Sequence, residues 1–346
     1  MTQETLVATP EAAFSLMELY FEKGWTDGLP VVPVSEASVN AMLDAAGLDA
    51  DTVVGEVALR NTRVTAGKVA INAIMAGCRP EYMPVVISAV KGLCHPNFGY
   101  HGVATSTGGA SVVIIVNGPI AGILGINAQG NAFGPGVRAN LTIGRALRLL
   151  MMNAINTRPG KLDRSTFGNP GKLAFCFAEN EEISPWEPLH VERGYSMEDS
   201  TTTLFAAESI IQTYNQLSNA PEPLLWGMAD AMANMGSMNI VGQQQIVVVF
   251  GGEHAEVLRK SGWSKANTKQ YLYEHARRTI ADLKRAGRLP GDLGENDASQ
   301  WRHPVRHPDD IVLVCAGGRV GSFSAILPGW GSHAGTESVT TPVQVS

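Results

Sequence analysis

Three glutamates follow a short apolar run in the segment KLAFCFAENEEISPW, residues 172–186. The apolar run predicts a strand, and ligand sites in α/β sheets commonly form at the carboxyl ends of strands. Partial burial at such a position would raise the pKa of a glutamate, which suits a general acid or base. We therefore predict Glu179 as the proton-transfer residue, with Asn180 beside it to orient and bind the substrate. Glu181 and Glu182 are expected to be solvated or paired with basic residues.

A proline-constrained loop, SPWEPLH, continues this segment and predicts fixed positions for Trp186 and His190. Histidine titrates near neutral pH, so His190 is a candidate for the second acid or base. The alternative is a structural loop in which Trp186 packs and His190 hydrogen-bonds the backbone.

A glycine-rich stretch leads into a predicted helix at GNAFGPGVRANLTIGR, residues 130–145. Glycines let a backbone approach a ligand closely, and the unpaired N–H groups of a helix N-terminus attract anions. Arg138, Asn140 and Arg145 are therefore predicted to bind a substrate carboxylate. In the alternative interpretation, the stretch is a simple connection whose arginines pair with nearby glutamates. The fingerprints GxGxxG and GxxxxGK[ST] are absent from the required strand-to-helix positions, which disfavours nicotinamide and ATP enzymes.

Hydroxyls and glycines cluster before a strand in CHPNFGYHGVATSTGGASVV, residues 94–113. His101 is a candidate proton carrier, and Thr105, Gly108 and Gly109 could bind a carboxylate or a carbonyl oxygen. The GxSxG elbow of serine hydrolases is missing, and turn chemistry alone could also explain this composition.

The four cysteines, Cys78, Cys94, Cys176 and Cys315, are far apart and form no CxxC pair. This spacing predicts free thiols in a reducing cytoplasm. Cys78 precedes Arg79, whose charge could lower the thiol pKa, so Cys78 is a candidate nucleophile. Cys176 and Cys315 lie in apolar strands and are expected to be inert. The eight histidines show neither HxH nor HExxH spacing, so we predict neither a metal nor another cofactor.

The overall composition is that of a globular protein, with 346 residues of which 45% are hydrophobic and 17% charged. So low a charged fraction fits a homo- or hetero-oligomer. A net charge of −6 without a basic patch argues against nucleic acid as a partner. No apolar run reaches the ~18–20 residues of a membrane span. The N-terminal residues show no signal peptide, so we expect a cytoplasmic protein.

The predicted elements follow from caps, breakers and apolar runs. In the N-terminal part we predict helices that start at Thr9-Pro10-Glu11 and at Ser35, two helices within 65–94 broken by Arg79-Pro80, strands at 111–119 and 172–179, and a helix at 141–155. Beyond residue 200 we predict helices at 202–215, 222–236 and 264–287, a strand–turn–helix unit at 244–262, and a strand at 311–327.

This alternation predicts an α/β or α+β fold, in which a mixed sheet is flanked by helices. Two strands end in Gly-Gly pairs, Gly251-Gly252 and Gly317-Gly318, which suggests two similar α/β lobes. We place a soft boundary near residue 200, between an N-terminal region (1–200) and a C-terminal region (201–346). A single compact domain is the alternative.

Four segments carry a resemblance to a known family: GWTDGLPVVPV, VAINAIMAGCRPEYMPVV, FGPGVRANLTIGRALRL and FAENEEISPWEPLHVERG. Over most of its length the chain resembles a bacterial family with a GWTDGLPVVPP-type segment. Members of that family look like companions of small (seleno)proteins named for a UGSC motif. Val34 stands where the family pattern has proline, and neither UGSC nor CGSC occurs here. The resemblance therefore implies a small partner protein that supplies a reactive cysteine or selenocysteine.

The residues together predict a hydrolase or a lyase, acting by hydration or elimination on a small carboxylate-bearing substrate. Backbone N–H groups of Gly108-Gly109, or of Gly134 and Gly136, would stabilise developing negative charge. Two alternatives stay open. One is a non-catalytic scaffold or pocket-forming partner of a small thiol or selenol redox protein, and the other is a small-molecule binding protein.

Overall fold

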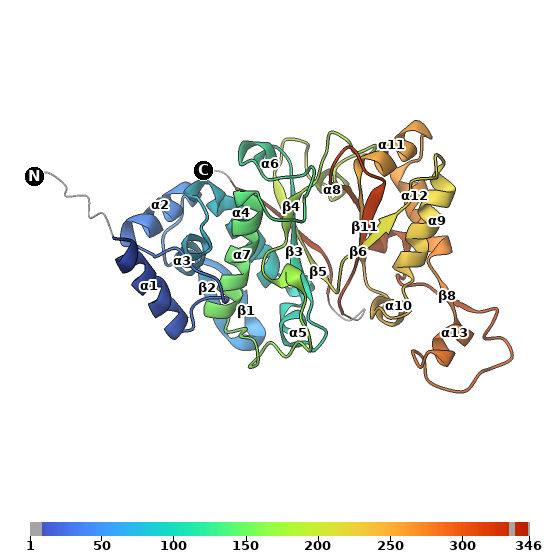
Figure 1. Ribbon diagram of the computed structural model, residues 1–346, viewed down its shortest axis with the longest axis horizontal. Helices are drawn as coiled ribbons and strands as arrows, with labels where there is room; N and C mark the ends of the chain where they lie inside the picture. The colour runs from blue at the N-terminus through green and yellow to red at the C-terminus, as the bar shows by residue number, and fades with distance from the viewer. Residues whose placement is uncertain (1–8, 332–335, 345–346) are drawn as a thin grey trace, which may run out of the picture.

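The computed structural model describes residues 9–331 and 336–344. Within these ranges, two four-stranded mixed sheets lie face to face, and helices cover the outer face of each sheet (Figure 1). Side chains of both sheets pack in the layer between them, among them Val113 and Phe177 of the first sheet and Val247 and Leu327 of the second. The predicted α/β class, with mixed sheets flanked by helices, is confirmed.

The two sheets share one strand order and one pattern of strand directions. The first consists of β12 (Val339–Pro342), β5 (Thr201–Ala207), β3 (Ser111–Asn117) and β4 (Cys176–Ala178), with β3 and β4 parallel and the other neighbours antiparallel. The second consists of β6 (Ile211–Tyr214), β11 (Phe323–Pro328), β7 (Ile246–Phe250) and β10 (Ile311–Cys315), with β7 and β10 parallel and the others antiparallel. The two similar lobes are thus one strand arrangement used twice.

The chain exchanges a strand between the two sheets. β5 lies in the first sheet and is followed by β6 in the second, whereas β11 lies in the second and is followed by β12 in the first. Where the two paths cross, the N–H of Glu208 donates to Pro328 O and the N–H of Trp330 donates to Ala206 O, each at 2.8 Å. This reciprocal pair is what a two-fold relation between the lobes would produce. Strands from beyond residue 200 complete the first sheet.

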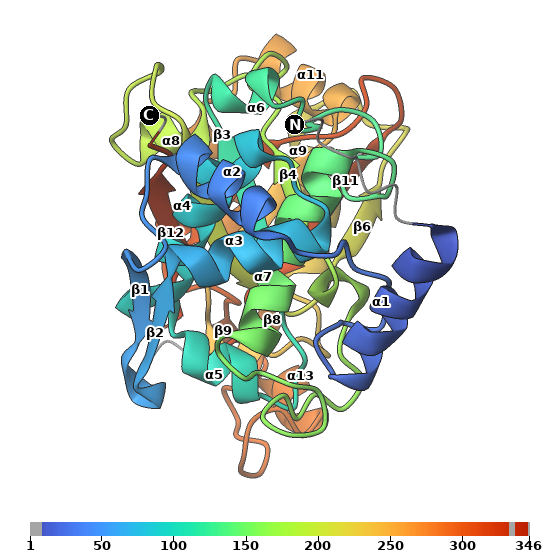
Figure 2. The ribbon, with the colours of Figure 1, turned by 90° about the vertical axis from the view of Figure 1, so that its left-hand side faces the viewer.

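Two helical layers enclose the sheets. α2 (Glu36–Ala46), α3 (Ala66–Ala76), α4 (Met83–Cys94) and α7 (Arg138–Asn153) form the layer over the first sheet, which faces the viewer in Figure 2. α9 (Pro221–Met232), α11 (Gly252–Lys260) and α12 (Lys265–His275) cover the second sheet. α1 (Pro10–Glu22) lies at the side of the molecule and has no buried residue. The predicted caps at Thr9 and Ser35 are confirmed, since each side chain accepts a hydrogen bond from the first helical turn.

Shorter elements connect these layers. They are the strand pairs β1 (Val53–Val57) with β2 (Thr62–Thr65) and β8 (Arg278–Thr279) with β9 (Trp301–Arg302); the helices α5 (Tyr100–Thr105), α6 (Ile120–Ile123), α8 (Leu189–Glu192), α10 (Asn239–Gly242) and α13 (Ile280–Arg285); and 3₁₀ turns at Ala58–Arg60, Pro80–Tyr82, Pro96–Phe98, Pro170–Lys172 and Pro308–Asp310. None of the helices in the described ranges is both long enough and apolar enough to cross a membrane.

Three predicted elements are wrong in type or extent. Residues 202–215 form β5 and β6 instead of a helix, because their threonines and isoleucines favour strands and β5 pairs with β3 along its whole length. The predicted helix 264–287 stops at the end of α12, and β8 interrupts it. The predicted strand 311–327 is two strands, β10 and β11, separated by a loop in which Gly317 and Gly321 have φ of 104° and 110°.

Candidate active site

The carboxyl ends of two edge strands, β4 and β10, meet and fix the position of Glu179. The N–H of Glu179 donates to Val116 O in β3 at 3.0 Å, and the N–H of Asn180 donates to Cys315 O in β10 at 2.7 Å. Glu179 therefore lies where the first sheet touches the second. Glu179 and Asn180 are buried, with 4% and 6% of their surface exposed, as predicted for this strand end.

One side-chain amide joins Glu179 to a second carboxylate. Asn117, the last residue of β3, donates from Nδ2 to Glu179 Oε2 at 2.6 Å and to Glu181 Oε1 at 3.1 Å. The N–H of Leu189 in α8 also donates to Glu179 Oε2, at 2.9 Å, and the N–H of Gly118 donates to Glu181 Oε1, at 2.8 Å. Two carboxyl groups thus share one donor at the ends of β3 and β4.

Burial raises the pKa of Glu179 from its ordinary value of 4.5 to about 7. The hydrogen bonds from Leu189 and Asn117 and the positive charge of Lys265 act in the opposite direction, and the charge of Glu181 adds to the increase. Loss of water outweighs the stabilising contacts, because an ionised carboxylate is strongly disfavoured in an apolar interior. The Glu179 carboxyl therefore changes its protonation state close to neutral pH, where a general acid or base is most effective.

His190 lies beside this pair and has unused hydrogen-bonding capacity. Its side chain has 0% exposure, its Nδ1 is 3.8 Å from Glu181 Oε1, and neither ring nitrogen has a hydrogen-bond partner among the described residues. The Oγ1 atom of Thr201 and the Oδ1 atom of Asn117 are likewise buried and unpartnered in this part of the chain. Thr201 pairs with Asn117 across β3 and β5. Because buried polar atoms normally have partners, these atoms suit a substrate or a bound water. We call Asn117, Glu179, Glu181, His190 and Thr201 the acid site.

Charged residues of α12 hold α8 over the acid site. Lys265 and Lys269, which are 6% and 7% exposed, both pair with Glu192 at the end of α8, and the distance from Lys265 Nζ to Glu192 Oε2 is 2.6 Å. Lys265 Nζ also donates to Glu187 O at 3.1 Å. Both lysines thus bind residues 187–192, the segment that carries His190, and hold it in position.

The acidic segment turns from buried to exposed within four residues. Glu182 has 79% of its side chain exposed, 3.7 Å from Arg319, as expected for a solvated or paired acid. Glu181 differs from the prediction, because it keeps 25% side-chain exposure and accepts its hydrogen bonds from Asn117 and Gly118 instead of a basic residue. Glu181 is thus the surface-facing member of the acid site.

The predicted carboxylate anchors on α7 are engaged elsewhere. Arg145 donates from Nε and Nη2 to both carboxylate oxygens of Asp27, at 2.8 and 2.7 Å. Arg138 donates from Nε to Gly77 O at 3.0 Å. Asn140 exchanges hydrogen bonds with the backbone of Asn127 and donates to Cys176 O. Both arginines thus have partners within the protein, a carbonyl for Arg138 and an aspartate for Arg145 instead of the glutamates of the alternative interpretation, and Asn140 fixes the loop before α7.

That loop lines a hollow next to the end of β10. The carbonyl of Ala128 accepts from Gly317 N at 2.9 Å, which joins the loop to the second sheet. The hollow has a volume of about 540 Å³ and is lined by residues 130–134 and 316–318 together with Val249 and Phe323. Gly134, one of the glycines predicted to stabilise negative charge, lines this hollow. Ala316 also lines it and directly follows Cys315, whose carbonyl accepts the hydrogen bond from Asn180 N–H. We call it the glycine hollow.

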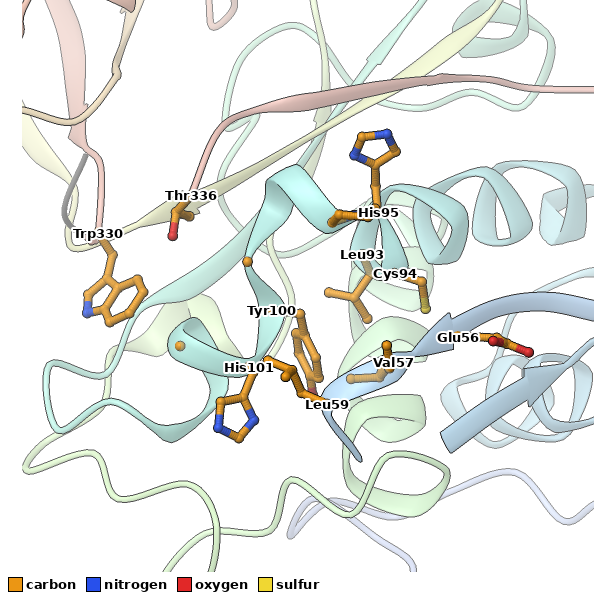
Figure 3. Close-up of a pocket in the computed structure, with 14 residues that line it drawn as sticks. Glu56, Val57, Leu59, Leu93, Cys94, His95, Tyr100, His101, Trp330 and Thr336 are labelled. Atoms are coloured by element: carbon orange, nitrogen blue, oxygen red, sulfur yellow. The ribbon is translucent and has the colours of Figure 1, made fainter. Parts of the chain in front are cut away.

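His101 lies at the other end of β3 from the acid site. It belongs to α5, which precedes β3, whereas Asn117 ends that strand, and a seven-residue strand spans about 20 Å. His101 lines a separate cavity of about 500 Å³ together with Cys94, Tyr100 and Trp330 (Figure 3). Its Nδ1 accepts a hydrogen bond from Arg60 Nε at 3.4 Å. The structure therefore does not bring His101 and Glu179 together.

The polar residues after His101 have local partners. Thr105 Oγ1 donates to His101 O at 2.9 Å, and the N–H of Gly108 donates to Ser106 Oγ at 2.9 Å. Gly109 has φ of 70°, and a Cβ there would lie 2.7 Å from Gly168 Cα. Turn chemistry and close packing thus account for this segment.

The thiols are protonated at neutral pH. Burial raises the pKa of Cys78 to about 12, and hydrogen bonding from Thr142 and the charge of Arg138 offset only part of this increase. Burial also raises the pKa of Cys94 to about 12 and increases those of Cys176 and Cys315. The expected lowering of the Cys78 pKa by a neighbouring arginine is therefore wrong, because desolvation dominates.

A serine–histidine pair emerges that the sequence pattern does not reveal. His254 Nδ1 lies 2.7 Å from Ser324 Oγ, and its Nε2 lies 3.0 Å from Asn215 O. Ser324 and Ile326 alternate onto the face of β11 that packs on the outer helices. We therefore assign the serine–histidine pair to packing of α11 on β11.

Neither the family models, nor the curated proteins, nor the solved structures compared with this chain include a match. The resemblance to companions of UGSC proteins stays a prediction based on the four quoted segments. In the described ranges, His, Cys, Asp and Glu side chains form no group of three or more that could hold a metal ion.

The raised pKa of Glu179 predicts a pH-dependent stability. The folded state holds this proton up to about pH 7, whereas the unfolded chain releases it near 4.5. The stabilisation is thus complete below pH 4.5 and is lost as the pH rises through 7, which amounts to roughly 3 kcal/mol. The unfolding free energy of Glu179→Gln minus that of the wild type, measured with urea, should therefore increase by this amount between pH 4.5 and pH 8.

The control for this titration is Glu182→Gln, because Glu182 is the exposed acid of the same segment. Its unfolding free energy should follow that of the wild type at every pH. Parallel curves for Glu179→Gln and the wild type would show that Glu179 ionises in its ordinary range.

Proposed function

We propose that this chain is a hydrolase or lyase in which Glu179 transfers the proton. The observation that supports this most directly is a buried carboxyl with a pKa of about 7, joined through Asn117 to a carboxylate that reaches the surface. A group that titrates near the working pH can both donate and accept a proton within one catalytic cycle. Pairs of acids in different environments are a recurring basis for acid/base catalysis.

Glu181 and His190 complete the proposed machinery. Glu181 lies between the buried Glu179 and solvent, shares the Asn117 amide donor with it, and helps to keep the pKa of Glu179 high through its negative charge. His190 is favoured over His101 as the second acid or base, because it lies 3.8 Å from Glu181 and has both ring nitrogens free of protein partners in the described ranges. Thr201 would hold a polar group of the substrate or the reacting water.

The roles follow for each reaction type. In an elimination, the Glu179 carboxylate would take a proton from carbon, while protonated His190 would donate one to the departing hydroxyl, which leaves as water. Hydration is the same sequence reversed. In a hydrolysis, Glu179 would take the proton of the attacking water, and His190 would protonate the leaving group.

The proposed substrate is a small carboxylate-bearing molecule whose body occupies the glycine hollow. Glycine loops on both sides of this hollow allow close approach of backbone N–H groups, which can stabilise negative charge. Arg138 and Arg145 take no part, because one binds Gly77 O and the other is paired with Asp27.

A second candidate is the pocket-forming partner of a small thiol or selenol protein. The raised pKa values of the cysteines favour this second candidate. Burial raises the pKa of all four thiols and leaves no reactive thiolate on this chain at neutral pH, so a partner would have to supply one. In that case the chain alone would show no turnover, and Glu179 would have no catalytic effect.

Glu179→Gln should reduce kcat/KM by about 10²- to 10⁴-fold, the usual contribution of a general acid or base. The probe is a panel of β-hydroxy and α,β-unsaturated carboxylates, together with simple carboxylate esters, followed by ¹H NMR in D₂O. The wild-type pH–rate profile should show an ionisation near 7. Glu182→Gln should retain activity. Full activity of Glu179→Gln, with unchanged oligomer size, would remove the catalytic role.

The two histidines provide a separate test of the arrangement. His190→Gln should lower kcat at least tenfold on the same panel, whereas His101→Gln should retain the wild-type rate, because it lies at the far end of β3. Size-exclusion chromatography and thermal melting of both variants check that they fold. The reverse outcome would place the chemistry in the cavity of Figure 3 instead.

A further inference from the structure

Two cations, the buried Arg148 and the half-buried Lys172, share one carboxylate beside α7. Lys172 Nζ lies 2.7 Å from Asp163 Oδ2, and Arg148 Nη2 lies 3.4 Å from the same oxygen. Arg148 is 9% exposed and Asp163 is 5% exposed. Ser165 Oγ donates to the other oxygen, Asp163 Oδ1, at 2.5 Å. In the described part of the chain, Asp163 is the carboxylate that pairs with these cations, so one positive charge is left over.

The excess charge resides on Arg148. Its Nη1 atom is buried and has no hydrogen-bond partner among the described residues. The pKa of Lys172 is lowered, chiefly by burial and in part by the charge of Arg148, so the two cations are close enough to repel each other. An uncompensated buried charge is strongly unfavourable unless a counter-charge or hydrogen-bond partner is supplied.

A third cation, Arg60, adds to this imbalance. Arg60 Nη2 is also buried without a partner in the described ranges, and Arg60 Nη1 donates to Thr157 Oγ1 at 2.7 Å. Burial raises the pKa of Tyr100 to about 12, and the charges of Arg60 and Arg148 both oppose that increase. Both guanidinium groups thus act on one phenol, and the region as a whole is positively charged.

A small hollow lies against these cations. It is lined by Arg148 and Lys172 together with apolar and glycine residues, namely Ala110, Val112, Gly144, Leu147, Met151, Gly171 and Phe175. The space open to the centre of a water-sized particle is about 20 Å³. A monatomic ion or a single water fits this space, whereas phosphate, sulfate or a carboxylate-bearing metabolite does not.

We propose that this hollow binds one small monovalent inorganic anion, such as chloride, held by Arg148 Nη1 and Lys172 Nζ. The anion supplies the missing negative charge and gives Arg148 its partner. The apolar lining strengthens the attraction, because the local dielectric constant is low. This site is independent of the acid site, since neither cation contacts it.

The test is a crystal of the wild-type protein grown or soaked in sodium bromide, with diffraction recorded at the bromine absorption edge. We expect an anomalous peak within hydrogen-bond distance of Arg148 Nη1. Absence of that peak, or density for a water that is unchanged by bromide, would overturn the proposal.

A measurement in solution tests the same anion site without a crystal. At constant ionic strength, replacement of sodium gluconate by sodium chloride should raise the Tm in a saturable manner. The response should vanish in Arg148→Gln and persist in Arg63→Gln, whose side chain is 74% exposed and paired with Glu56. A wild-type Tm that is the same in both salts would contradict the proposal, even if Arg148→Gln fails to fold.

Discussion

The exchange of strands between the two sheets is the constraint on which the rest of the structure depends. Reciprocal hydrogen bonds at Glu208 and Trp330 join the two chain segments where they cross from one sheet to the other. Each sheet therefore takes its last strand, β12 or β6, from a segment that comes from the other sheet. The sheets are thereby held face to face, and their shared layer of Val, Phe and Leu side chains excludes water. This same exclusion raises the pKa of Glu179, since the carboxyl lies at the edge of that layer.

At the acid site, the arrangement that the proposed function requires is unfavourable for stability. An ionised Glu179 and an unpartnered His190 both make the folded state less stable than a fully apolar or fully paired interior would. Lys265 and Lys269 of α12 pair with Glu192 and so hold α8, which carries His190, in place. Such locally unfavourable arrangements are typical of sites where groups are held ready for a substrate.

The two lobes share a strand arrangement but differ in chemistry at corresponding strand ends. In the first lobe, Asn117 ends β3 and Glu179 follows β4, and these two polar residues are hydrogen-bonded to each other. In the second lobe, Gly251 follows β7 and Ala316-Gly317 follow β10, and these residues line the glycine hollow. We infer that repetition of one unit provided both halves of the site, one for proton transfer and one to admit a ligand close to the backbone.

The sequence predicts the buried strand end at Glu179 and Asn180, because an apolar run that ends in acids shows both the strand and where it stops. It could not reveal Asn117, which is 62 positions from Glu179, or Thr201, which is placed by its pairing with Asn117 across β3 and β5. The partner of Arg145, Asp27, is likewise 118 residues away. His101 and His190 look equally suitable in sequence, and only the direction of β3 separates them. In 202–215 the strand signal is weak, because β5 is buried on both faces and so lacks the alternation that marks a half-exposed strand.

The most direct test of the account is the ionisation of Glu179 itself. Infrared difference spectra between the wild type and Glu179→Gln, recorded from pH 5 to 9, isolate the carboxyl C=O stretch of this one residue. The account predicts a protonated band that is present at pH 5 and disappears with a midpoint near 7. A carboxylate already ionised at pH 5 would contradict the central claim, because Glu179 could then not act as an acid at neutral pH.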